Sequence, residues 1–111
     1  MTIYKGSKKM IRQATNSDIC DLKAIAEACF SNKPEDYFEE SLSRCEIYIV
    51  TDHSEAVGYA MLNWSPKYSL YKRLEIPEIQ DLNISPEFRQ RGLASQLVEF
   101  CENKVKEAGK D

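Results

Sequence analysis

The segment with the clearest chemical potential is a basic turn that contains a glycine and precedes the last helical pattern. It reads Arg89-Gln90-Arg91-Gly92-Leu93-Ala94-Ser95. The first turn of a helix presents N–H groups without intrahelical partners and the positive end of the helix dipole. Gly92 and Ala94 would let an anion approach this backbone, and Arg89 and Arg91 add positive charge. The pattern favours a phosphate-like ligand.

Other readings of this turn are open. It is neither a P-loop nor a dinucleotide-binding fingerprint, because no Gly-Lys-Ser/Thr follows and G-x-G-x-x-G is absent. From spacing alone, it can also be a solvated turn in which the glycine permits a tight bend.

The elements that must position this turn follow from hydrophobic periodicity and from helix start and stop signals. Thr15 to Asp18 has the S/T-x-x-D pattern of a helix start, and Pro34 is expected to open a second helix. The expected elements are a strand at 10–15, a helix that buries Ile19, Leu22, Ile25, Ala26, Cys29 and Phe30, a helix from 34 to 45, strands at 46–51 and 57–64 joined by a turn, a long extended segment at 74–84, and a helix at 92–108 ended by Gly109. The order β-α-α-β-β-β-α predicts an α/β fold, with a mixed sheet covered by helices.

Length and composition limit the function further. The chain has 111 residues with a formal net charge of −3, and its 42% hydrophobic share excludes general disorder. We expect one domain over residues 1–111. The mild acidity argues against nucleic acid as a partner. No apolar run approaches the roughly 18 residues of a membrane span, so no membrane partner is expected.

Cysteine usage indicates the compartment. Cys20, Cys29, Cys45 and Cys101 have wide, irregular spacing, and His53 is the one histidine. This pattern predicts no metal site. We interpret the cysteines as small buried apolar residues in a reducing environment and predict a cytoplasmic protein. A catalytic thiol is the less favoured alternative.

The stretch Arg89-Gln90-Arg91-Gly92-Leu93-Ala94 resembles the Q/R-x-x-G-x-G/A motif of the GNAT superfamily of N-acetyltransferases. The preceding segment, 82–88, is similar to the strand and turn that lead into that motif, and the element order from Met10 onward also matches. This resemblance implies acetyl-CoA as co-substrate and a primary amine, small or peptidic, as acceptor. Transfer would occur by direct attack of the amine on the thioester.

The resemblance also implies roles for individual residues. Main-chain N–H groups over Arg89 to Ala94 (Arg89, Gln90, Arg91, Gly92, Leu93 and Ala94) would hold the diphosphate, with Ser95 adding a hydroxyl. Leu82 and Ile84 would pair with the pantetheine arm as an added strand does. A strand N–H near Asn83 or Ile84 would polarise the acetyl carbonyl.

A carboxylate on the long strand often serves as base in this family. Glu78, eleven residues before Arg89, is the first candidate and Asp81 the second. For both, the polar face of a strand or an ion pair is the alternative. Trp64, Tyr68 and Tyr71 would line an acceptor site or, as the favoured reading, pack in the core and anchor a loop.

The sequence departs from the family pattern after its last helix, because the expected later strands and helix do not follow Asp111. The chain can be a fragment, a domain completed by a second copy, or a short relative that binds cofactor weakly. An open edge at 74–84 favours self-association, so a homodimer is predicted. The alternatives to an enzyme are a truncated, non-catalytic acetyl-CoA-binding or dimerisation module, and a small protein–protein module with a fortuitous turn.

Overall fold

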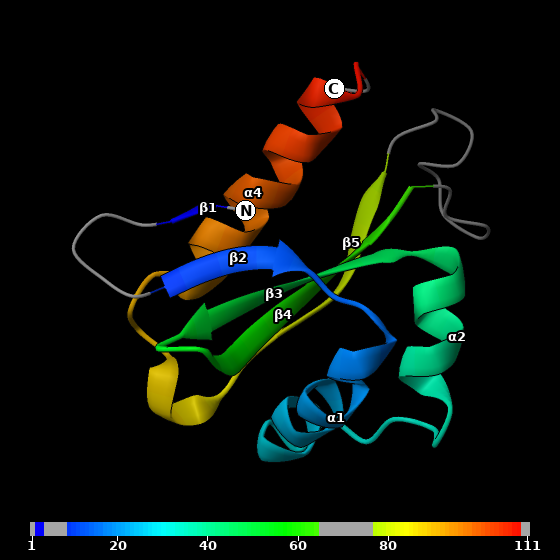
Figure 1. Ribbon diagram of the computed structural model, residues 1–111, viewed down its shortest axis with the longest axis vertical. Helices are drawn as coiled ribbons and strands as arrows, with labels where there is room; N and C mark the ends of the chain where they lie inside the picture. Colours follow the sequence, from blue (N-terminus) through cyan, green and yellow to red (C-terminus); the bar gives the residue numbers. More distant parts are fainter. Residues whose placement is uncertain (1, 4–8, 65–76, 110–111) are drawn as a thin grey trace.

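The computed structural model describes residues 2–3, 9–64 and 77–109. Within them, five strands form one sheet in the order β1-β2-β3-β4-β5, and all neighbours pair antiparallel (Figure 1). The strands are β1 (Thr2–Ile3), β2 (Lys9–Gln13), β3 (Glu46–Asp52), β4 (Glu55–Asn63) and β5 (Glu78–Ile84). The helices are α1 (Ile19–Ala28), α2 (Tyr37–Arg44) and α4 (Leu93–Glu107), with 3-10 turns η1 (Asn16–Asp18) and η2 (Pro86–Phe88). The α/β class and the predicted element order are confirmed, and β1 is an addition to them. The described strands form an antiparallel sheet rather than the mixed sheet expected, because strands consecutive in the chain lie side by side.

The sheet separates two apolar cores. Helices α1 and α2 cover one face, where Leu22, Phe38 and Tyr59 are buried, and α4 covers the other, where Val50, Leu93 and Leu97 are buried (Figure 1). Burial of side chains this large supplies the main favourable term in folding. The two layers therefore fix α4 and the α1–α2 pair on opposite sides of β5.

Local signals in the sequence account for several boundaries. The Asp18 carboxylate accepts the Thr15 N–H at 2.8 Å, as the helix-start pattern predicted. It also pairs with Arg12 at 2.8 Å, a contact that the pattern did not predict. His53 and Ser54 have φ of 51° and 72°, the left-handed pair that a tight two-residue hairpin requires. Gly109, with φ of 74°, follows α4 as its predicted stop.

Three expectations from the sequence are wrong. Helix α1 ends at Ala28, so Phe30, with φ of 56°, is 92% exposed rather than buried. Helix α2 begins at Tyr37 rather than at Pro34, because the Tyr37 N–H donates to the Pro34 carbonyl and residues 34–37 form a separate turn before the helix. Cys20 is exposed and Cys29 only partly buried, whereas Cys45 and Cys101 are buried as expected.

The remaining expectations concern connections and termini. Of the extended segment 74–84, strand β5 occupies Glu78–Ile84, while residues 74–76, Tyr68 and Tyr71 lie outside the described residues. Trp64 donates its indole N–H to Glu46 at 2.8 Å. None of the helices in the described part of the chain is both long and apolar enough to cross a membrane.

Candidate functional site

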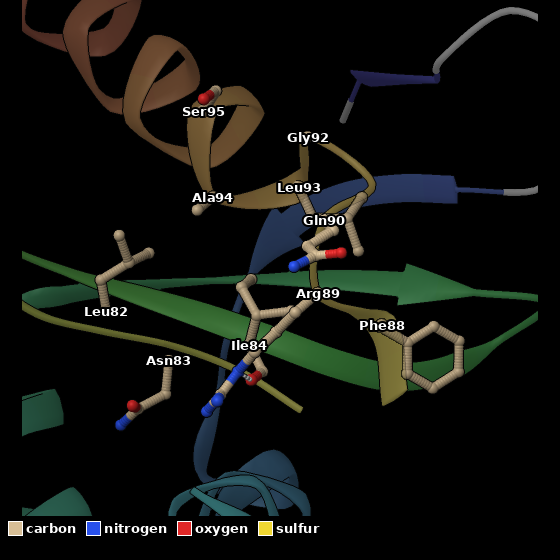
Figure 2. Close-up of a pocket in the computed structure, with 10 residues that line it drawn as sticks. All are labelled: Leu82, Asn83, Ile84, Phe88, Arg89, Gln90, Gly92, Leu93, Ala94 and Ser95. Atoms are coloured by element: carbon tan, nitrogen blue, oxygen red, sulfur yellow. Dashed lines mark hydrogen bonds between the residues drawn. The ribbon is translucent and has the colours of Figure 1, made fainter. Parts of the chain in front are cut away.

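A cavity of about 480 Å³ lies where the end of β5 meets the start of α4 (Figure 2). Its volume is in the usual range for small-molecule sites. Nine of the ten residues predicted to bind the cofactor line it, and Arg91 is the exception. The lining is formed by Leu82, Asn83, Ile84, Phe88, Arg89, Gln90, Gly92, Leu93, Ala94 and Ser95. Residues that the sequence pattern grouped as one loop and one strand thus share a single cavity.

The backbone of the loop prepares the start of α4 to receive an anion. Gln90 and Gly92 both have left-handed backbone, with φ of 64° and 77°. Gly92 is the N-cap of α4, no side chain among the described residues caps the helix, and no acidic residue stands in its first turn. The N–H groups of the first turn therefore carry their positive partial charge without a capping side chain from the protein.

The two arginines of the loop do not reinforce this cradle directly. Arg89 turns away from Gly92 and donates its Nε–H to the Ile84 carbonyl at 3.0 Å (Figure 2). The guanidinium of Arg91 lies over the Phe88 ring, 5.0 Å from its centroid. Arg89 thus lines the cavity while its Nε–H holds the end of β5, and the N–H groups at the start of α4 are the donors next to Gly92.

Strand β5 presents alternate peptide groups to its outer edge. Ser85 donates its N–H to Val57 on the β4 side at 2.8 Å, and Ile84 opposes Gly58 one position earlier. In an antiparallel ladder, paired and outward-facing positions alternate. Ile84 and Leu82 therefore direct their peptide groups away from β4, and Asn83 directs its own toward β4. The Ile84 carbonyl is taken by Arg89 and by the Cys29 thiol at 3.3 Å, so its N–H is the group of this residue left for a ligand.

Asp81 belongs to a polar cluster on the face of the sheet that α1 and α2 cover. Its Oδ2 accepts the Tyr37 hydroxyl at 2.9 Å and the Tyr59 hydroxyl at 2.8 Å, and Lys33 Nζ lies at 3.2 Å. Asn83 in turn donates its amide to the Tyr59 oxygen at 2.9 Å. The cluster thus connects the cavity-lining Asn83 to Asp81.

Burial raises the pKa of Tyr37 well above its usual value, and the hydrogen bond to Asp81 is a smaller cause of the same shift. Burial likewise raises the pKa of Tyr59. Both hydroxyls therefore stay neutral donors to Asp81 across the physiological range. The cation that contacts the Asp81 carboxylate in the described part of the chain is the ammonium of Lys33.

Glu78, the first candidate base, stands at the start of β5 and is half-buried. It opposes Asn63 on β4 and accepts the Gln80 side-chain amide at 3.2 Å. The register of β4 and β5 shifts between Met61 and Leu62, which leaves Gln80 without a paired residue. Such an irregularity re-aims neighbouring side chains in a strand.

Sequence patterns did not identify Lys33, Tyr37, Tyr59 or Phe88 as parts of the site. Tyr37 and Tyr59 meet Asp81 from 44 and 22 residues away. Local periodicity carries no signal at such separations. Phe88 was recoverable, since it lies within the segment 82–88 that resembles the family.

The model of the acetyltransferase (GNAT) family matches residues 16–111. The chain belongs to the GNAT family. It is 28% identical over 103 residues to an uncharacterized N-acetyltransferase of Archaeoglobus fulgidus, a match that covers 80% of this chain and 68% of the relative.

Solved structures show the same fold. The Escherichia coli ribosomal-protein-S18-alanine N-acetyltransferase aligns with a TM-score of 0.76 at 14% identity, covering 91% of this chain. The aminoglycoside N-acetyltransferase AAC(6')-Iy, solved in complex with CoA, aligns with a TM-score of 0.76 at 22% identity, covering 97% of this chain and 76% of its own. This GNAT chain spans 61% of the length of the E. coli structure.

Proposed function

We propose that this chain is an acetyl-CoA-dependent N-acetyltransferase that transfers the acetyl group to a primary amine. One observation carries the proposal: the uncapped start of α4 and the outward-facing amides of β5 line the same cavity. A diphosphate needs the first feature, and an extended amide-containing arm needs the second. Membership of the GNAT family and the CoA complex of AAC(6')-Iy support the same co-substrate.

Different residues of the cavity would bind different parts of acetyl-CoA. The N–H groups from Arg89 to Ala94 would hold the diphosphate, and the exposed Ser95 hydroxyl would add a further donor. Leu82 and Ile84 would pair with the pantetheine arm through their outward-facing peptide groups. Since Asn83 directs its N–H toward β4, Ile84 is the proposed donor to the acetyl carbonyl, where negative charge develops during attack.

Glu78 remains the proposed base, because three donors already surround one oxygen of Asp81. Glu78 does not line the cavity and stands six positions before Ile84, about 20 Å along the strand, so it would take the proton of the acceptor ammonium through a chain of water molecules. The amine nitrogen then forms a bond to the thioester carbon, and the C–S bond breaks. The departing thiolate takes up a proton as free coenzyme A.

Binding is tested first, by calorimetry with acetyl-CoA and with S-acetylpantetheine, which lacks the diphosphate. We expect acetyl-CoA to bind and S-acetylpantetheine to bind at least a hundredfold more weakly. The matched variant is Ser95→Glu: a carboxylate in the first turn stabilises a helix by roughly 0.5 kcal/mol but repels a diphosphate there. It should melt no lower than the wild type and bind acetyl-CoA more weakly. Equal binding of the two ligands would refute the diphosphate site.

Turnover is tested second, by release of the coenzyme A thiol with a panel of primary amines. Binding without release by any amine would favour the second candidate, a non-catalytic acetyl-CoA-binding or dimerisation module. A cytoplasmic location and a homodimer remain predictions that accompany either function.

A further inference from the structure

The Lys33 ammonium lies in a site made of a carboxylate and an aromatic face. Its Nζ is 3.2 Å from Asp81 Oδ2 and 4.7 Å from the centroid of the Tyr37 ring. The Asp81 side chain is 10% exposed and that of Lys33 is 23% exposed. A carboxylate beside an aromatic ring, partly shielded from water, is a favourable environment for an alkylammonium group.

This ammonium site borders the cavity at β5. Asn83 lines that cavity and is joined to Asp81 through the Tyr59 hydroxyl, by contacts of 2.9 and 2.8 Å. Asp81 lies two positions before Asn83 on the same strand face, or about 7 Å along the strand. A molecule bound at Asp81 would therefore lie next to the proposed site of acetyl transfer.

A second cavity, of about 230 Å³, lies at the connection between α1 and α2 and is lined in part by Lys33. Ser31, Pro34 and Glu35 of the same connection line it too. Since Lys33 lines this cavity and also reaches Asp81, its side chain runs from one to the other. Removing that side chain would extend the cavity toward the carboxylate.

We propose that Asp81 and Tyr37 form the subsite that binds the alkylammonium group of the amine acceptor, and that Lys33 occupies this subsite when no acceptor is bound. The inference rests on the proposed function and names its substrate class, a primary alkylamine carried as a cation. The Lys33 side chain indicates this class of acceptor, because it is itself a four-carbon chain that ends in an ammonium group.

The exchange is electrostatically balanced. A largely buried carboxylate is costly without a cation, and the Tyr37 and Tyr59 hydroxyls are neutral donors. Lys33 supplies the charge from a connecting segment outside α1 and α2, so the acceptor can replace it without leaving Asp81 unpaired. A subsite that is free one-tenth of the time binds its ligand tenfold more weakly than a subsite that is always free.

The test is an NMR titration with n-butylammonium chloride, the free equivalent of the lysine side chain, without acetyl-CoA. Lys33→Ala vacates the subsite, and we expect it to bind the probe at least tenfold more tightly than the wild type, with shifts at the Asn83 side-chain amide and at Tyr37. Lys33→Arg keeps a cation in place and should behave as the wild type does. Neutral 1-butanol should not bind.

The matched control is Lys104→Ala. Lys104 also lies over an aromatic ring, that of Phe100 at 5.5 Å, but on α4 across the sheet from Asp81. It should leave the titration unchanged. Equal affinity of Lys33→Ala and wild type, or equal binding of 1-butanol, would overturn the proposal. Since no coenzyme A is present, that result would leave the proposed acetyltransferase function to its own tests.

Discussion

The substitution of Gly92 by alanine separates strain in the protein from obstruction of the ligand. Gly92 and Gly109 begin and end the same helical segment with nearly equal backbone, at φ of 77° and 74°. A Cβ at Gly92 would meet no protein atom nearer than Gln96 Nε2 at 3.9 Å, and one at Gly109 would meet nothing within 4 Å. Neither methyl group is therefore crowded by the protein.

The cost to stability follows from the backbone alone. An L-residue in left-handed conformation costs roughly 1 kcal/mol relative to glycine. We expect Gly92→Ala and Gly109→Ala each to lower the free energy of unfolding by about this amount, as measured by urea denaturation. The two variants should differ little from one another.

Ligand binding should distinguish them. Gly92 lines the cavity, so its added methyl group projects into the space proposed for the diphosphate. We expect calorimetry to show at least a tenfold loss of acetyl-CoA affinity, about 1.4 kcal/mol, in Gly92→Ala and none in Gly109→Ala. If both variants bind acetyl-CoA as the wild type does, the start of α4 does not hold the diphosphate.

Three further predictions address the fold around the site. The Arg12 guanidinium, hydrogen-bonded to Asp18, lowers the pKa of that carboxyl from 3.8 to about 2. Asp18→Asn should therefore lower the free energy of unfolding in urea by about 2 kcal/mol at pH 7. The difference in stability between the variant and the wild type should vanish as the pH falls from about 4 to 2. Gly58→Ala places a methyl group against Ile84 Cδ1 and 3.1 Å from the Asn83 carbonyl oxygen. This overpacking should lower the free energy of unfolding by about 1–3 kcal/mol and weaken acetyl-CoA binding. Wild-type stability together with wild-type affinity would contradict the close packing of β4 on β5. Among the described strands β5 is the last of the sheet, and this edge predicts self-association; light scattering that shows a monomer at high concentration would rule it out.

Local sequence signals predicted the parts of the fold that local chemistry determines. The Thr15–Asp18 helix start, the hairpin turn and the glycine that ends α4 each depend on residues a few positions apart. The loop and the end of β5 were singled out by their resemblance to the GNAT motif, and they line one cavity because they are nearly continuous in sequence.

The remaining features depend on tertiary context. Periodicity placed Phe30 on the buried face, but the helix ends at Ala28 and the left-handed backbone of Phe30 points its ring to solvent. Proline permits a helix start without enforcing one, so α2 begins three residues after Pro34. The contacts of Asp81 with Lys33 and the two tyrosines join three segments, and no spacing rule connects them.

The Ile84 carbonyl oxygen accepts two hydrogen bonds, and this limits what can pair with the edge of the sheet. Arg89 and Cys29 already occupy its acceptor oxygen, so an incoming polypeptide strand would find a donor there but no matching acceptor. A second protein chain needs both to continue a ladder, whereas a ligand that offers a single oxygen needs the donor alone. The end of β5 at Ile84 therefore suits a small molecule better than a further strand, and a second copy of the chain that pairs with β5 would have to use the positions before Ile84.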